Sequence, residues 1–146
     1  MSKGRVLLAH GNADCRKIYG SVLAFSGYDV EVVADGESAL RQLETLSFDI
    51  VVSDLYLSSD GDECLPRTVR TNPHTAHLPL VVITGWMTEP HRRLALDVGA
   101  DAFLALPTRP RDLVEIVARL LEQPSVPLTS IDVVNDPRNH TVANGH

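Results

Sequence analysis

The chain has 146 residues, enough for one domain with a buried core and too few for two ordinary ones. Its content of 44% hydrophobic and 22% charged residues is typical of a globular domain in water. The formal net charge of −6 argues against a general binder of nucleic acid or anionic membranes, because such proteins carry a basic face. No apolar run approaches the roughly 20 residues of a membrane span, and the apolar stretch of about four residues before His10 is too short for the h-region expected of a signal peptide. A cytoplasmic protein is therefore expected.

Short apolar runs alternate with helical patterns five times, which is typical of β-α units and a parallel sheet. The predicted strands are 5–9, 29–34, 49–53, 80–84 and 102–106. Runs such as Val51-Val52 are apolar without alternation, as expected for strands covered on both faces. The second strand has a more mixed pattern, which favours a place near an edge.

The first two helices are predicted from their caps and apolar spacing. The first begins after an N-cap at Asn12 or Asp14 and ends at Gly27. Its buried stripe is expected to hold Ile18, Val22 and Phe25. The second helix follows Asp35-Gly36, and its inward face is expected to hold Ala39, Leu40, Leu43 and Leu46.

The remaining helices show equally local signals. The third begins near Leu65, because Pro66 is tolerated only in a first turn. The fourth and fifth take N-caps at Thr88 and Thr108. The fourth ends at Gly99, and its inward residues are Leu94, Ala95 and Val98. The fifth has the most regular amphipathic spacing, with Leu113, Ile116, Val117, Leu120 and Leu121 facing inward.

After Gln123 the helical pattern stops, and prolines alternate with small polar residues. We divide the chain into a domain, 1–122, and a flexible C-terminal tail, 123–146. A small apolar group in the tail, Ile131, Val133 and Val134, could dock on the domain or on a partner. The tail is too short to fold an effector domain, so the protein is expected to act on other molecules in trans.

Ligands of open α/β sheets bind outside the carboxyl ends of the strands. The predicted sheet places His10-Gly11, Asp54, Thr84-Gly85 and Leu106-Pro107 at these ends. Asp54 is the most informative of them, because it ends a buried apolar run and is followed by Asp60-Gly61. A buried strand that delivers one carboxylate to its end presents a reactive group there.

The order and spacing of several motifs resemble a response-regulator receiver domain over residues 4–122. The matching stretches are Gly27-Tyr28-Asp29-Val30, Ala34-Asp35-Gly36-Glu37-Ser38-Ala39-Leu40, Asp54-Leu55-Tyr56-Leu57 with Asp60-Gly61, and Gly99-Ala100-Asp101-Ala102-Phe103-Leu104 with Pro107. The resemblance implies a doubly wound, five-stranded parallel sheet of the flavodoxin-like order 2-1-3-4-5, with helices on both faces. It also implies a place in two-component or phosphorelay signal transduction.

The resemblance assigns roles to particular residues and shows departures from the pattern. Asp54 matches the phosphoacceptor, and Thr84 and Phe103 match the switch hydroxyl and the rotating aromatic. His10 and Gly11 stand where receivers carry an acidic pair for Mg²⁺, and imidazole and glycine are poor substitutes for carboxylates. Leu106, directly before Pro107, stands where receivers carry a lysine, and leucine offers neither charge nor hydrogen bond. We therefore expect no metal site and no cofactor, with Mg²⁺ only if the chain is a working phosphoacceptor.

Each of these side chains has a purely structural alternative. Asp54 could accept backbone N–H groups at a strand end, Thr84 could be a turn residue, and Phe103 could be a core aromatic. His10 is expected within reach of Asp54, and the carboxylate would then raise the proton affinity of the imidazole. A lone His–Asp pair supplies too few ligands for zinc. Cys15 and Cys64 lack CxxC spacing and are expected as small buried thiols, with a redox pair as the alternative.

The leading hypothesis is an atypical stand-alone receiver that signals through protein contacts, with weak or absent phosphorylation of Asp54. It is not expected to be an enzyme. The alternative is a working phosphoacceptor, phosphorylated on Asp54 by a histidine kinase. A third class, an enzyme or cofactor binder, lacks support, because the chain has neither GxGxxG in the loop 10–14 nor a GxSxG motif.

The expected partners are a histidine kinase, a downstream signalling protein or a second copy of the chain, and neither nucleic acid nor a membrane. A local group of basic residues on an acidic protein suits an acidic partner or a homodimer. This predicted interface consists of Arg92, Arg93, Arg109 and Arg111.

Overall fold

The computed structural model describes residues 2–57, 64–85 and 89–122. In chain order the elements are β1 (Arg5–Ala9), α1 (Ala13–Phe25), β2 (Asp29–Val33), α2 (Gly36–Thr45), β3 (Ile50–Ser53), α3 (Leu65–Thr71), β4 (Leu80–Thr84), α4 (Glu89–Asp97), β5 (Ala102–Ala105) and α5 (Pro110–Glu122). β1 and β4 have the predicted bounds, and the other strands differ from the prediction by one residue at an end.

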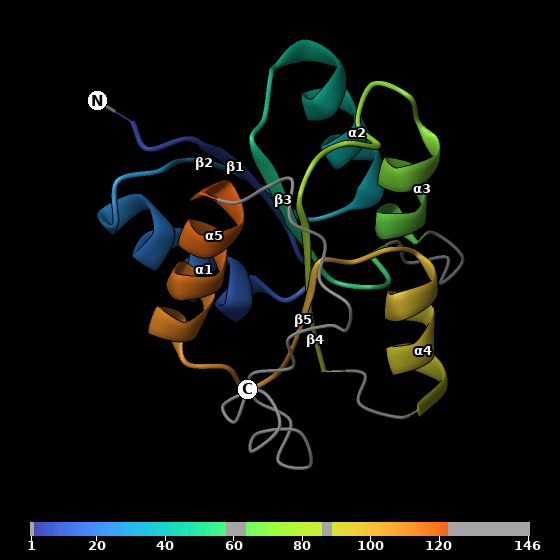
Figure 1. Cartoon of the computed structure of the whole chain (residues 1–146). Coiled ribbons are helices and arrows are strands. Elements are labelled where there is room, and N and C mark those ends of the chain that lie inside the picture. Colours follow the sequence, from blue (N-terminus) through green and yellow to red (C-terminus); the bar gives the residue numbers. More distant parts are fainter. Residues whose placement is uncertain (1, 58–63, 86–88, 123–146) are drawn as a thin grey trace.

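The five strands form one parallel sheet in the order β2-β1-β3-β4-β5. Figure 1 shows α1 and α5 on one face of this sheet and α2, α3 and α4 on the other. The predicted doubly wound architecture is therefore confirmed, and β2 lies at an edge as its mixed pattern indicated. The chain turns outward from β1 to β2 and then returns to place β3 on the other side of β1, so the order reverses between β1 and β3.

The core lies on both faces of the sheet, because successive strand residues point to opposite sides. On the α1 and α5 face, β1 contributes Val6 and Leu8. On the other face, Leu7 and Ala9 pack with residues of α2 and α3. A third cluster forms beneath α4 and consists of Leu55, Val82, Ala95 and Phe103.

The predicted buried stripe of α1 is wrong for Ile18 and Phe25, whereas Val22 is partly buried and packs against the core. Ile18 is 51% exposed and Phe25 is 93% exposed, while the helix buries Tyr19, Gly20 and Leu23. The helix packs close to the sheet at Gly20, where a Cβ atom would lie 3.2 Å from a methyl group of Val32. The helix therefore turns the side with Gly20 toward the sheet, because the small residue permits close approach, and not the side with the larger apolar residues.

The starts of α1 and α3 follow the sequence prediction, and the start of α5 departs from it. The Asn12 side chain caps α1 by accepting the Cys15 N–H at 2.9 Å, and Pro66 lies in the first turn of α3. Thr108 does not cap α5, because its buried Oγ1 has no hydrogen-bond partner among the described residues. Its carbonyl instead accepts the Tyr19 hydroxyl at 2.7 Å, which ties the loop before α5 to α1. Thr88 lies outside the described residues.

The inward faces of the remaining helices are largely as predicted. On α2, Ala39 is buried, but Leu46 is 37% exposed, because the helix ends at Thr45 and the chain has left the helical path there. On α4, Ala95 and Val98 are buried. The stripe of α5 is confirmed, with four buried residues, Leu113, Ile116, Val117 and Leu120.

The structure bears on the predicted tail and on membrane spans only as far as the described residues extend. The predicted tail, 123–146, lies outside the described residues. Within the described ranges, no helix has the length and apolar character to cross a bilayer.

Candidate functional site

The sheet register brings His10 and Asp54 together. Ala9 pairs with Ser53, so the next residues of β1 and β3 leave the sheet side by side. The Asp54 N–H donates to the Ala9 carbonyl at 3.0 Å and holds the two strand ends in line. This pair flanks the point where the strand order reverses, which is where open α/β sheets bind their ligands.

The Asp54 carboxylate is nearly buried and is held by the backbone. The residue is 9% exposed, and its Oδ1 accepts the Leu55 N–H at 2.7 Å. The predicted contact between this strand-end carboxylate and the following loop is thus confirmed. Its other oxygen, Oδ2, lies 3.5 Å from Nε2 of His10.

The His10 ring is buried. The residue is 3% exposed, and its Nδ1 accepts the Asn12 N–H at 3.1 Å. An Nδ1 that accepts a hydrogen bond assigns the proton of the neutral ring to Nε2. Sequence reasoning missed Arg16, whose guanidinium donates to the His10 carbonyl at 2.8 Å from one helical turn beyond Asn12.

The expected rise in proton affinity of His10 is wrong. Burial of the ring lowers the pKa of His10 below its ordinary value and outweighs the Asp54 carboxylate and the Ile83 carbonyl, which raise it. The Arg16 guanidinium lowers the pKa of His10 further. The ring is therefore neutral around neutral pH, and the pair consists of a neutral donor beside an anionic acceptor.

The lowered pKa of His10 predicts that the protein loses stability in mild acid. Below about pH 6.5, the ordinary histidine value, the unfolded chain takes up a proton that the folded ring resists. The free energy of unfolding should fall there, with a slope from this group of at most about 1.4 kcal/mol per pH unit. Chemical unfolding at several pH values would measure it, with His10→Gln as control. If wild type and His10→Gln lost stability in parallel, His10 would not be the group responsible.

Thr84 and Phe103 lie in the interior next to these strand ends. Thr84 is fully buried at the end of β4 and pairs in register with Ala105. Phe103 is 1% exposed on β5 and packs in the cluster that contains Leu55, the neighbour of Asp54. Its prediction as a core aromatic is confirmed, and its role as a rotating switch stays a prediction.

Comparison with known proteins agrees with this geometry. The profile of the family described as "Response regulator receiver domain" matches residues 6–118. The regulator of alkaline phosphatase synthesis PhoP of Bacillus subtilis is 31% identical over 112 residues, which are 76% of this chain and 45% of PhoP. The DNA-binding response regulator MtrA of Mycobacterium tuberculosis is 30% identical over 142 residues, 94% of this chain and 61% of MtrA. The chain belongs to the response regulator receiver domain family.

A solved structure supports the same assignment. A putative response regulator from Chloroflexus aurantiacus superposes with a TM-score of 0.75 at 28% identity, covering 82% of this chain and 98% of that one. The chain is thus a receiver domain of two-component signalling, a class of domain that interacts with histidine kinases and other signalling proteins. It spans 45% of PhoP and 61% of MtrA, so those proteins contain further sequence that has no counterpart in this match.

The magnesium ion that receiver domains imply does not fit the side chains beside Asp54. Mg²⁺ prefers a near-octahedral set of oxygen ligands, whereas His10 presents a ring N–H and Gly11 has no side chain. Asp14 is exposed on the first turn of α1. Within the described ranges, no group of three His, Cys, Asp or Glu side chains could hold a metal ion.

The lysine position of the receiver pattern is occupied by a core side chain. Leu106 is partly buried and packs against the cluster on the α1 and α5 face. Its N–H donates to the Thr84 carbonyl at 2.9 Å, which extends the pairing of β4 and β5 to the site. Pro107 follows through a cis peptide bond and is exposed. An apolar group at this place adds no positive charge beside Asp54.

Both cysteines are free and only partly buried. Burial raises the pKa of the Cys15 thiol, and the Asp54 and Asp14 carboxylates raise it further. Burial also raises the pKa of the Cys64 thiol. Because the reactive form of cysteine is the thiolate, these shifts disfavour a redox role at neutral pH.

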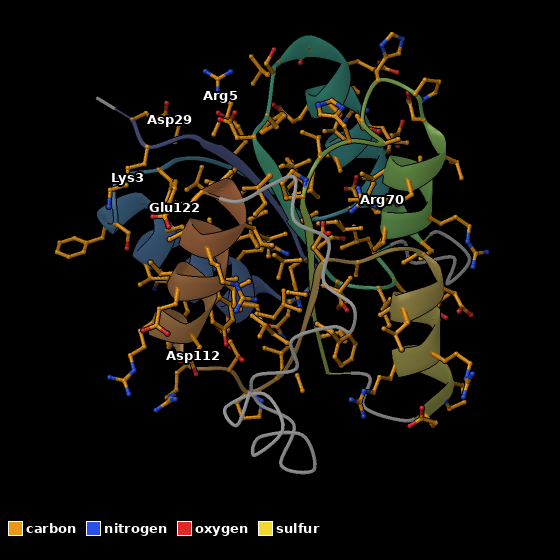
Figure 2. The ribbon with its side chains drawn as sticks, viewed as in Figure 1. Lys3, Arg5, Asp29, Arg70, Asp112 and Glu122 are labelled. Carbon is orange, nitrogen blue, oxygen red and sulfur yellow. The ribbon has the colours of Figure 1, made fainter. Side chains whose placement is uncertain are left out.

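The predicted basic interface is divided between two helices that flank β5. Arg92 and Arg93 lie on α4 and Arg111 lies on α5, with Arg93 and Arg111 exposed. Arg109 donates to the buried carboxylate of Asp112 (labelled in Figure 2) at 2.9 Å, at the start of α5. The positive charge of Arg109 is thus paired within the domain, and its place in an interface stays a prediction.

A hollow of about 520 Å³ lies away from Asp54, between the ends of α2 and α3. Its walls include Leu43, Leu46 and Thr75, which precede β3 and β4 and therefore lie toward the opposite edge of the sheet. None of the site residues predicted from the sequence lines this hollow.

Proposed function

We propose that the chain is an atypical receiver domain that signals through protein contacts, with Asp54 phosphorylated weakly or not at all. The observation that carries this proposal is the pairing at the strand ends, where His10 rather than a carboxylate faces Asp54 at 3.5 Å. Phosphoryl transfer to a carboxylate depends on neutralising the charge of the transferred group. The side chains at the acidic-pair and lysine positions offer no charge for that purpose at neutral pH.

The proposal makes the domain a binding module and not an enzyme. Its partners would be a histidine kinase or a downstream signalling protein, or a second copy of the chain. Arg93 and Arg111 are exposed on the two helices beside β5 and suit an acidic surface. A cytoplasmic location, expected from the sequence, is consistent with such a role.

A working phosphoacceptor is the second candidate, because one observation favours it. The Leu55 N–H donates to Oδ1 of Asp54 and leaves the other carboxylate oxygen, Oδ2, outside that hydrogen bond. This oxygen lies at the strand end where phosphorylated receivers react.

We expect no stable adduct when the protein is incubated with acetyl phosphate and Mg²⁺, because the charge of the phosphoryl group is not neutralised. Intact-mass spectrometry would detect a gain of one phosphoryl group. Asp54→Asn serves as the matched control, and a second series omits the metal. A labile adduct that forms with wild type and is lost in Asp54→Asn would instead establish the working phosphoacceptor.

A further inference from the structure

His10 is held at its ring and at its backbone, and its ring has one polar atom without a hydrogen bond among the described residues. Nδ1 accepts the Asn12 N–H at 3.1 Å, and Arg16 donates to the His10 carbonyl at 2.8 Å. Rotating the ring by half a turn would place a carbon where the Asn12 amide needs an acceptor. The backbone of the loop after β1 thus selects the tautomer with the proton on Nε2.

Nε2 lies beside the Asp54 carboxylate, and the ring also lies near the backbone carbonyl of Ile83. Nε2 is buried and has no hydrogen-bond partner among the described residues. Asp54 Oδ2 lies 3.5 Å away, just beyond hydrogen-bond distance. A shift of about 0.6–0.8 Å would form a charge-assisted hydrogen bond, because such bonds have donor–acceptor distances of about 2.7–2.9 Å.

Nε2 of His10 lies 3.5 Å from Asp54 Oδ2, at a position where receiver domains carry a carboxylate for the ion. A ring N–H carries a partial positive charge and has no lone pair to offer, so it repels a cation. At Gly11 the backbone leaves room for a side chain, because a Cβ atom there would have no other atom within 4 Å. The backbone at residue 11 would therefore accommodate an aspartate, and the carboxylate is missing only because the residue is glycine.

We propose that His10 replaces the divalent cation as the partner of Asp54, with its Nε2–H holding the carboxylate directly, and that the site does not bind Mg²⁺. The inference deepens the proposed function, on which it rests, by naming what stabilises Asp54 in a receiver without the ion. His10 is a positioning residue in this scheme, because it acts on Asp54 and on no substrate.

The first experiment follows the Leu55 amide by ¹H–¹⁵N NMR, because this N–H donates to Asp54 at 2.7 Å and reports on its carboxylate. In wild type we expect the Leu55 signal to be unchanged by millimolar Mg²⁺, and the His10 ring to carry its proton on Nε2. His10→Ala should shift the Leu55 signal, and His10→Gln, which keeps a neutral N–H donor, should restore it in part. A Leu55 shift with Mg²⁺ that disappears in Asp54→Asn, or a ring protonated on Nδ1, would overturn the proposal.

The second experiment restores the acidic pair. In the double variant His10→Asp with Gly11→Asp, we expect added Mg²⁺ to raise the melting temperature, because a ligand that binds only the folded state stabilises it. Wild type and the matched control Gly11→Asp should show no such rise. Adding Asp54→Asn to the double variant should abolish it. A wild type that responds like the double variant, or a folded double variant that does not respond, would contradict the proposal.

The two proposals can fail separately. Mg²⁺ binding by wild type without an Asp54 adduct would overturn the role of His10 and leave the atypical receiver standing. An Asp54 adduct formed by a protein that binds no Mg²⁺ would overturn the atypical receiver and leave the role of His10 standing. The titration of wild type decides the metal question even if the double variant does not fold.

Discussion

Replacing Arg70 with methionine should lower the free energy of unfolding by about 3 kcal/mol, the low end of what breaking a buried charge pair costs. The Arg70 guanidinium (labelled in Figure 2) donates to the carboxylate of Asp101 at 2.8 Å and to the carbonyl of Gly99 at 3.0 Å. It also donates to two carbonyls in the loop before β4, those of Ala76 and Leu78. One side chain on α3 thus joins the loop before β4 to the loop before β5.

The same substitution leaves a carboxylate without its cation. Asp101 Oδ2 also accepts the Leu80 N–H at 2.8 Å, where β4 begins. The Arg70 and Asp101 side chains are 20% and 29% exposed, so water replaces only part of what is lost. The estimate stays at the low end of the range for this reason.

The control for Arg70 lies on the same helix. Arg67 is exposed, and Arg67→Met makes the same chemical change one turn earlier in α3. Urea unfolding followed by circular dichroism should place Arg67→Met within about 0.5 kcal/mol of wild type. Equal effects of the two substitutions would mean that the Arg70 contacts contribute little in solution.

The fold could be predicted because its signals are local. Buried parallel strands appear as continuous apolar runs, and a polar residue ends the runs of β1, β3 and β4. The N-cap at Asn12 and the place of Pro66 depend only on side chains within one turn, so both were predictable. The adjacency of His10 and Asp54 follows from the strand order alone, because paired strands end together.

What could not be predicted depends on contacts distant in sequence. On α1, two stripes are compatible with helical spacing, and the sequence does not say which one faces the sheet. The larger stripe, with Ile18 and Phe25, proved exposed, because Gly20 allows the other side to approach Val32. Thr108 has the residue type of a cap, but its loop is held through Tyr19, 89 residues earlier.

The chemistry of His10 shows the same division. Its neighbour Asp54 was predictable from the strand ends, and from that neighbour alone the pKa of His10 should rise. The opposite direction comes from burial of the ring. The accepting role of Nδ1, which assigns the ring proton to Nε2, comes from one backbone amide, that of Asn12. Neither the burial nor the orientation of the ring is readable from residue types.

Phe103→Ala should be the most destabilising single substitution in the site region, at about 3–5 kcal/mol. The ring is 1% exposed and fills the cluster beneath α4 together with Leu55, Val82 and Ala95. Removing it leaves a cavity between β5 and α4 and withdraws a contact from Leu55, whose N–H holds the Asp54 carboxylate. Chemical unfolding measures the loss, and Phe103→Leu, which retains most of the volume, should lose far less.

Phe25 provides the matched control for this substitution and tests the orientation of α1 at the same time. Phe25→Ala removes the same group of atoms from a side chain that is 93% exposed, so the free energy of unfolding should change by no more than about 0.5 kcal/mol. A loss comparable to that of Phe103→Ala would show that Phe25 is buried in solution, either against the domain or against a second copy. A negligible loss for Phe103→Ala would mean that the ring is not part of a packed core, and the rotating role implied by the receiver family would become the better account of this residue.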